Sequence, residues 1–146
     1  MNKPFVLIAD DNEATCTLLI ALLRNDFTVE TAHDGAEAIA KLTSRRYAAV
    51  LLDLLMPRFD GYDVLQFVRT ERPDMMARIL VVTASLTERQ MQRVRTYPIC
   101  GVVAKPFDVE VLLSAVKDCA GDDGDGPSRS TLLSTGVILM LADLLR

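Results

Sequence analysis

The sequence predicts an α/β fold: a doubly wound parallel sheet of five strands, each followed by a helix. Short apolar runs rich in Val, Ile and Leu recur along the chain and end in polar residues, which is typical of buried parallel strands. The segments between them have the length and the capping residues of helices. Such alternation predicts right-handed crossovers and helices on both faces of the sheet. A chain of 146 residues is long enough to bury a substantial core in one domain.

The expected elements follow in order along the chain. We expect strands at about 4–9, 27–32, 48–52, 78–82 and 100–104, and helices at about 13–24, 35–45, 61–72, 88–97 and 109–119. The second strand alternates apolar and polar residues, as an edge strand does. Side chains that cap helix N-termini precede four of the five helices: Asn12 or Asp11, Asp34, Thr87 and Asp108.

Composition excludes several classes of protein. Half of the residues are hydrophobic, a quarter are charged and the net charge is −4, so no global charge favours nucleic acid or an anionic membrane. No apolar run reaches the ~20 residues of a transmembrane helix, and the N-terminal run is too short for a secretory signal. We therefore expect a cytoplasmic protein without membrane association or direct nucleic-acid binding.

The three cysteines are Cys16, Cys100 and Cys119. Their number is odd and their spacing is wide, which argues against a disulfide framework or a zinc site. We expect them to be unpaired, buried apolar side chains in a reducing compartment.

Composition changes after residue 120. Residues 1–120 are expected to form the domain, residues 121–130 an acidic, glycine-rich linker, and residues 131–146 an apolar tail. Apolar residues in the tail recur at helical spacing: Leu133, Val137, Met140 and Leu144. Our hypothesis is that residues 131–145 form a helix that supports a homodimer; packing on the same chain or a disordered end are the alternatives.

Five polar residues follow or end the predicted strands: Asp10, Asp11, Asp53, Thr83 and Lys105. Ligands of open α/β sheets bind beyond the carboxyl ends of the strands, where these side chains should meet. Clustered carboxylates need a counter-ion, and oxygen ligands suit Mg²⁺. A hydroxyl and an ammonium suit phosphoryl oxygens. Each residue alone has an ordinary explanation, such as a helix cap or a solvated lysine, but four strand ends together favour a site.

These residues resemble the receiver domain of two-component response regulators over about residues 4–119. The resemblance is carried by Asp10-Asp11, the run from Asp53 to Gly61, Thr83-Ala84 and Lys105-Pro106-Phe107. It implies the flavodoxin-like sheet order 2-1-3-4-5. It also implies that Asp53 is the phosphoacceptor, that Thr83 and Lys105 contact the phosphoryl group, and that Mg²⁺ is bound by Asp10, Asp11, Asp53 and the backbone carbonyl of Leu55.

The implied function is a phosphorylation-activated signalling switch, not a turnover enzyme. A histidine kinase, a phosphotransfer protein or a small phosphodonor would supply the phosphoryl group. The face formed by residues 87–119 is a second candidate for dimerisation. We expect a cis Lys105-Pro106 bond, because the chain must turn sharply there and the family points the same way. Val102 stands where the family often has an aromatic switch residue, so that switch is not expected here.

Two alternative functions come from other classes. The chain could be the N-terminal receiver of a longer DNA-binding transcriptional regulator. It could also be a haloacid-dehalogenase-like phosphatase, but such enzymes place a second acid two residues after the nucleophile, where this chain has Leu55.

Overall fold

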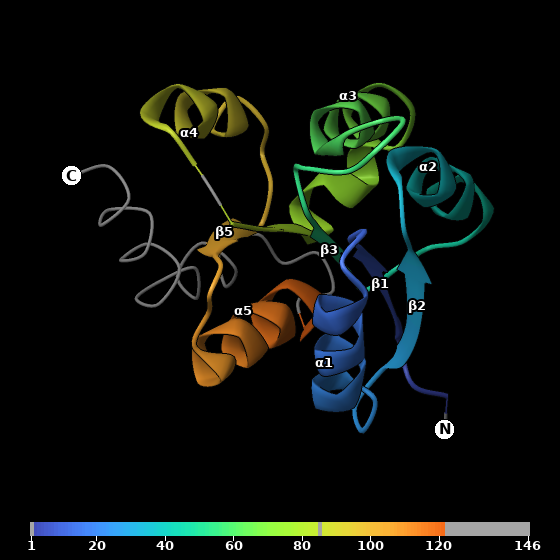
Figure 1. Cartoon of the computed structure of the whole chain (residues 1–146). Helices are drawn as coiled ribbons and strands as arrows, with labels where there is room; N and C mark the ends of the chain where they lie inside the picture. Colours follow the sequence, from blue (N-terminus) through green and yellow to red (C-terminus); the bar gives the residue numbers. More distant parts are fainter. Residues whose placement is uncertain (1, 85, 122–146) are drawn as a thin grey trace.

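The computed structural model describes residues 2–84 and 86–121. Within them, five parallel strands form one sheet in the order β2-β1-β3-β4-β5 (Figure 1). The strands are β1 (Phe5–Ala9), β2 (Thr28–Ala32), β3 (Ala49–Leu52), β4 (Ile79–Thr83) and β5 (Gly101–Ala104). The predicted fold class and strand order are confirmed, and β2 is an edge strand as expected.

Helices cover both faces of the sheet. They are α1 (Glu13–Leu23), α2 (Gly35–Ser44), α3 (Gly61–Glu71), α4 (Glu88–Val94) and α5 (Val109–Gly121). Helices α1 and α5 lie on one face, and α2, α3 and α4 lie on the other (Figure 1). Helix starts match the predicted caps, since the side chains of Asn12, Asp34 and Thr87 each accept a backbone N–H of the first turn. Asp108 does the same at α5.

One extra helix and one shortened helix differ from the expectation. A 3₁₀ helix, η1 (Pro73–Arg78), precedes β4 and was not predicted. Pro73 suits the first position of such a turn, because it lacks an N–H that would otherwise need a partner. Helix α4 ends at Val94 rather than near Tyr97, and a turn in which the Tyr97 N–H donates to the Val94 carbonyl (3.0 Å) replaces its last residues.

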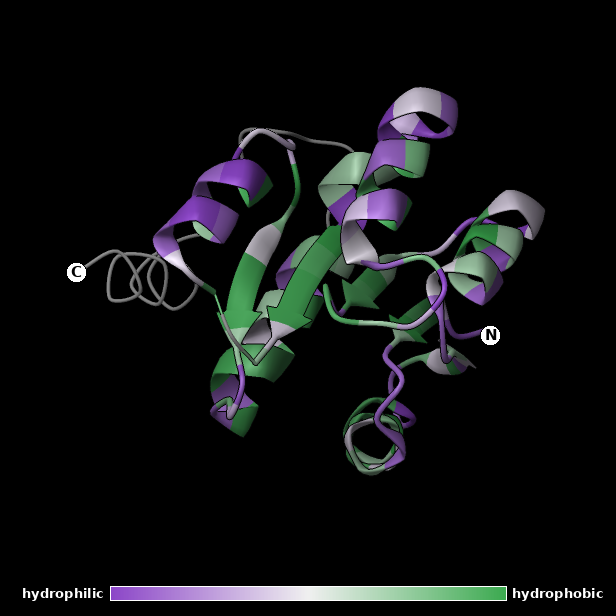
Figure 2. Cartoon of the chain, turned by 45° about the horizontal axis from the view of Figure 1, so that its top comes forward, coloured by the Kyte–Doolittle hydropathy of each residue, from purple (hydrophilic) through white to green (hydrophobic). Residues whose placement is uncertain are grey.

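The core consists of two layers, one on each side of the sheet. Alternate strand residues enter each layer, so Leu7 and Val50 pack toward α2, α3 and α4, whereas Ile8 and Leu51 pack toward α1 and α5. The central strands are mostly hydrophobic, whereas the helices carry polar residues as well as hydrophobic ones (Figure 2). Strands buried on both faces read as continuous apolar runs, which explains why the sequence pattern was clear.

The cysteines correct one expectation. All three are buried, but Cys100 and Cys119 form a disulfide with a Cα–Cα distance of 5.9 Å, and Cys16 is free. The prediction of unpaired cysteines is therefore wrong for two of the three. Spacing along the chain did not show this pair, because the fold brings the start of β5 next to the last turn of α5.

The structure also bears on the Lys105-Pro106 bond, on membrane-spanning helices and on the start of the predicted linker. The Lys105-Pro106 bond is cis, as predicted. None of the helices in residues 2–84 and 86–121 has both the length and the apolar character needed to cross a membrane. Helix α5 includes Gly121, the first residue of the predicted linker. The rest of that linker and the predicted helical tail at 131–146 lie outside the described residues.

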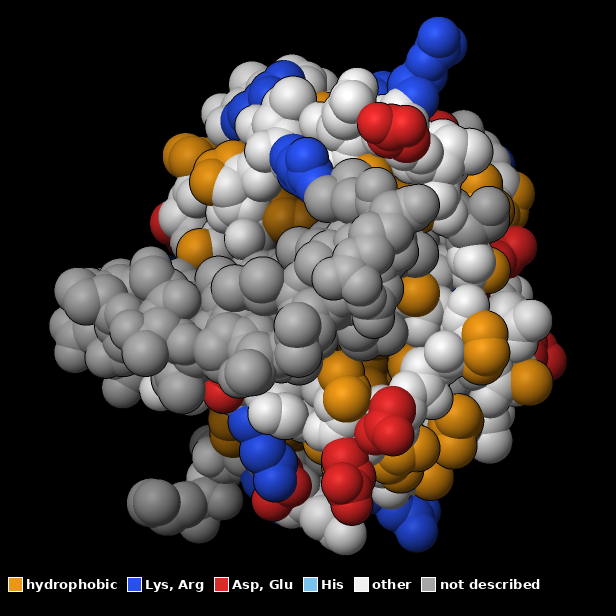
Figure 3. Space-filling view, turned by 90° about the vertical axis from the view of Figure 1, so that its left-hand side faces the viewer, with side chains coloured by type: hydrophobic (Ala, Val, Ile, Leu, Met, Phe, Trp, Pro, Cys, Tyr) orange, Lys and Arg blue, Asp and Glu red, His pale blue; other side chains and the backbone are white. Residues whose placement is uncertain are grey.

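Helix α4 contacts α3 through stacked side chains. The Arg93 guanidinium lies 3.8 Å from the centre of the Tyr62 ring, and Arg69 of α3 lies 4.5 Å from that of Tyr97. Arg89 on α4 and Arg95, the residue just after α4, are exposed. The side of the molecule on which α4 lies shows basic side chains toward its top (Figure 3).

Candidate functional site

Four polar side chains meet at the carboxyl edge of the sheet. Asp10 follows β1, Asp53 follows β3, Thr83 ends β4 and Lys105 follows β5. The strand order makes β1 and β3 neighbours, with Ala9 paired to Leu52, so the two aspartates extend from adjacent positions. Thr83 is likewise paired with Ala104, the residue before Lys105. The register of the sheet therefore assembles the site without any contribution from a long loop.

Lys105 joins the two aspartates. Its Nζ donates to Asp10 Oδ2 at 2.6 Å and to Asp53 Oδ2 at 3.2 Å. The Thr83 hydroxyl donates to the other oxygen of Asp53, Oδ1, at 2.9 Å. The side chains of Asp10 and Asp53 are 4% and 8% exposed, and that of Lys105 is 16% exposed. Burying charges is unfavourable unless they are paired, and this ammonium supplies the pairing.

The site also raises the pKa of Lys105. Burial acts to lower it, but the hydrogen bond to Asp10 and the negative charges of Asp53 and Asp10 outweigh burial. Lys105 is therefore held in its cationic form, with its charge directed at the carboxylate of Asp53. A cation in that place can neutralise charge that develops on oxygens near Asp53.

Three carboxylates lie close enough together to share a metal ion. One oxygen each from Asp10, Asp11 and Asp53 can be chosen such that all three lie within 4.8 Å of one another. Asp11 is exposed, whereas the other two are buried. Oxygen-only donors partly open to water suit Mg²⁺, which keeps several waters when it binds. The donor set thus fits the metal that the sequence predicts.

Leu55 lies beside these carboxylates. Its N–H donates to Asp53 Oδ1 at 3.1 Å, which turns the chain tightly after the aspartate. Leu55 and Asp11 line the same surface depression, of about 440 Å³, together with Met56, Pro57 and Asp60. Two of the residues proposed from the sequence for metal binding, Asp11 and Leu55, therefore line this depression, and Leu55 is also hydrogen-bonded to Asp53.

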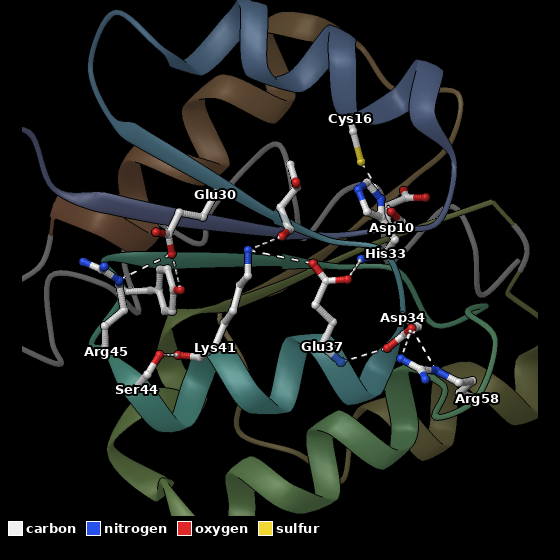
Figure 4. Close-up of polar contacts among 12 residues, drawn as sticks. Asp10, Cys16, Glu30, His33, Asp34, Glu37, Lys41, Ser44, Arg45 and Arg58 are labelled. Carbon is white, nitrogen blue, oxygen red and sulfur yellow. Dashed lines mark hydrogen bonds and ion pairs between the residues drawn. The ribbon is translucent and has the colours of Figure 1, made fainter.

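The loop between β3 and α3 is fixed by contacts that sequence reasoning missed. Arg58, at a φ of 65°, donates from Nε and Nη2 to Asp34 Oδ2 at 2.9 and 2.6 Å (Figure 4). The Gly35 N–H donates to the Phe59 carbonyl at 2.9 Å. The pKa of Asp34 is lowered, first by the backbone N–H of Glu37 and then by Arg58. Asp34 was expected only as a helix cap, and a partner 24 residues away carries no local signal.

Gly61 holds the start of α3 against the chain around Asp53. Its N–H donates to the Leu54 carbonyl at 3.0 Å. A Cβ at this position would lie 2.5 Å from the backbone oxygen of Asp53, which is too close for any other residue. The glycine therefore allows α3 to begin directly behind the aspartate.

The response regulator receiver domain family matches residues 6–117 of this chain. The chain belongs to that family. Among curated relatives, the response regulator MprA of Mycobacterium ulcerans is 34% identical over 120 residues, which cover 77% of this chain and 48% of the relative. MprA of Mycolicibacterium vanbaalenii is 33% identical over 141 residues, covering 88% and 57%. This receiver chain thus spans about half the length of the curated relatives it matches.

Solved structures agree with the assignment of this receiver chain. The receiver domain of sensor histidine kinase PA1611 from Pseudomonas aeruginosa, with a magnesium ion coordinated in its active site cleft, is 25% identical. Its TM-score is 0.74, over 82% of this chain and 99% of that one. A chain of the CheX–CheY–BeF₃–Mg²⁺ complex from Borrelia burgdorferi is 27% identical. Its TM-score is 0.73, over 80% of this chain and 88% of that one.

Proposed function

We propose that this receiver is a phosphorylation-activated signalling switch in which Asp53 accepts the phosphoryl group. The donor would be a phosphohistidine of a histidine kinase or phosphotransfer protein, or a small phosphodonor. One observation carries the proposal: Asp53 receives the Thr83 hydroxyl on one oxygen and the Lys105 ammonium on the other, beside two further carboxylates. An aspartate that only ended a strand or capped a helix would not need a hydroxyl, an ammonium and two further carboxylates around it.

The proposed reaction uses the carboxylate of Asp53 as a nucleophile. A carboxylate oxygen forms a bond to phosphorus while the bond from phosphorus to the donor nitrogen breaks, and the electron pair leaves with that nitrogen. Lys105 offsets charge on the transferring oxygens. Mg²⁺, held by Asp10, Asp11, Asp53 and the carbonyl of Leu55, would supply further charge neutralisation. The product is an acyl phosphate on Asp53.

The signal would then pass from Thr83 to α4. A phosphoryl group adds close to two negative charges and new acceptor oxygens. The Thr83 hydroxyl, now bound to Asp53, would donate to one of those oxygens instead. Residues 84–87 join Thr83 to the first turn of α4, so a shift of Thr83 reaches that helix directly. Val102 lies buried in β5, and the relay proposed here needs no aromatic residue at that position.

Of the two alternative functions, the phosphatase is disfavoured and the receiver of a longer regulator is favoured. A phosphatase of the haloacid-dehalogenase type would need a second acidic residue two positions after Asp53. That position is Leu55, whose side chain is apolar and half-exposed. We therefore propose a switch that is phosphorylated and dephosphorylated rather than a turnover enzyme. The reading as the receiver part of a longer regulator is favoured by the length of its relatives, about twice that of the matched region. We place the protein in the cytoplasm, where a kinase could reach it.

Intact-mass measurement tests the phosphoacceptor. The chain incubated with acetyl phosphate should gain one phosphoryl group only when Mg²⁺ is present, and Asp53→Ala should gain none. Asp26→Ala, which removes an exposed acid at the far end of α1, is the matched control and should behave as the wild type. An adduct that persists in Asp53→Ala, or that forms equally in EDTA, contradicts the proposal. Lys105→Ala should still bind Mg²⁺ but respond poorly to phosphorylation.

A further inference from the structure

The disulfide lies at the end of the sheet opposite to the carboxylates. Cys100 immediately precedes β5, whereas Lys105 immediately follows it. Cys119 lies in the last turn of α5, 19 residues along the chain. The bond therefore closes a loop that contains all of β5, Lys105 and most of α5, and it joins the start of the strand to the end of the helix.

Apolar packing surrounds this pair and also holds α5 on the sheet. Cys100 and Cys119 belong to the core layer between the sheet and helices α1 and α5. Val103, Leu112 and Val116 are fully buried in the same layer and hold α5 on the sheet. These apolar contacts do not involve the sulfur–sulfur bond, so we expect the domain to fold with the pair as thiols or as a disulfide.

Polar contacts gather around the same place. Arg78 Nη1 donates to the carbonyls of Cys119 and Ala120, at 3.0 and 3.3 Å. The N–H of Cys100 donates to the carbonyl of Ile79 at 2.8 Å. Residues 78–79 thus hold the backbones on both sides of the bond. The end of a helix is where local opening is easiest, so the last turn of α5 is the part whose opening the bond controls.

We propose that Cys100 and Cys119 form a reversible thiol-oxidation site whose state determines how firmly the C-terminal end of α5 is attached to the sheet. The co-reactant is a two-electron oxidant of the peroxide class. When the last turn of α5 opens locally and exposes the buried thiols, one thiolate attacks a peroxide oxygen, which gives a sulfenic acid and releases water after proton uptake. The second thiolate then attacks that sulfur and displaces hydroxide, which takes up a proton. Two thiols and one peroxide thus give a disulfide and two waters, and the sulfurs lose two electrons.

The Cys100–Cys119 pair affects only the end of the domain opposite to the carboxylates. Cys16, the remaining thiol, donates to the Asp10 carbonyl at 3.3 Å and takes no part. The phosphoryl site uses the carboxyl ends of the strands, and the disulfide uses the amino end of β5. Oxidation should therefore leave phosphoryl chemistry unchanged while it fixes the point from which the chain continues beyond Gly121. This inference does not depend on the proposed phosphorylation.

The test compares the reduced chain with the chain treated with hydrogen peroxide. Alkylation after unfolding should label three cysteines in the reduced form and one, Cys16, in the oxidised form. Closing a loop of this length should raise the Tm by about 10 °C. Amide exchange in the last turn of α5 should slow by about tenfold, because the bond opposes its local opening. Glutathione or dithiothreitol should restore three thiols in the folded protein.

Variants separate the pair from the other cysteine. Cys16→Ala should keep the whole rise in Tm, and the double variant Cys100→Ala/Cys119→Ala should show none. Beryllofluoride binding should differ less than twofold between the redox forms. The proposal fails if three thiols remain after oxidation of the folded chain, if the bond resists reduction without unfolding, or if the bond forms and exchange in α5 does not change.

Discussion

The variant Asp11→Asn should be more stable than the wild type when Mg²⁺ is absent. When Mg²⁺ is saturating, the same variant should be the less stable of the two. Oxygens of Asp11, Asp10 and Asp53 can lie within 4.8 Å of one another. Two charges at that distance repel by about 0.9 kcal/mol even at the dielectric constant of water. Asp11→Asn removes two such repulsions, and the lost attraction to Lys105 offsets part of the gain. We expect a net stabilisation of about 1 kcal/mol, or about 3–5 °C in Tm.

Magnesium should reverse this order. A ligand at 100 times its Kd stabilises the folded state by about 2.7 kcal/mol, and a site lacking one of its carboxylates loses most of that gain. The wild type should therefore become the more stable protein once Mg²⁺ is saturating. The chain has no tryptophan, so urea unfolding followed by far-ultraviolet circular dichroism, in EDTA and in Mg²⁺, is the suitable assay.

A matched variant controls for net charge. Asp26→Asn makes the same change in charge at an exposed position just beyond the other end of α1. It should change stability little in either buffer. The reasoning is refuted if Asp11→Asn is no more stable than the wild type in EDTA, or if Mg²⁺ stabilises both proteins equally.

Two further predictions concern residues around Asp53. Gly61→Ala should destabilise the domain by about 1–3 kcal/mol, since the new Cβ meets the Asp53 carbonyl, whereas Gly121→Ala, with open space around it, should not; urea denaturation compares the two. Lys105→Met should lower stability by up to about 3 kcal/mol by leaving Asp10 and Asp53 without their cation. Because the folded pKa of Lys105 is raised above 10.5, its contribution is complete below that pH and is lost as the pH rises through the folded pKa. Thermal melts from pH 8 to 11 should show the wild type and Lys105→Met converging at the alkaline end, and a constant difference would contradict this.

The sequence predicted the sheet well because β1, β3, β4 and β5 are buried on both faces, whereas the edge strand β2 is less buried. Such strands are continuous apolar runs, and four of the five strands end at or just before a residue with site chemistry, so fold and site were predicted from the same signal. The positions of Asp53, Thr83 and Lys105 depend only on strand order and register. Once the order 2-1-3-4-5 was known, their convergence was a consequence of geometry.

The features that the sequence did not show depend on contacts between distant parts of the chain. Cys100 and Cys119 are separated by a strand and most of a helix, and no spacing rule links them. The ion pair of Arg58 with Asp34 needs the β3–α3 loop to reach the start of α2. Arg58 does so in a left-handed conformation, for which glycine or asparagine would be the usual sequence signal.

The contact between α3 and α4 has a consequence for how this protein can be observed. The chain contains three tyrosines and no tryptophan. Tyr62 and Tyr97 both lie in that contact, each with an arginine stacked on its ring, whereas Tyr47 is hydrogen-bonded to Glu30 elsewhere. Any movement of α4 changes the surroundings of two of the three chromophores. Near-ultraviolet absorbance and tyrosine emission of the unlabelled protein should therefore report movement of α4, the helix through which we expect the signal to pass.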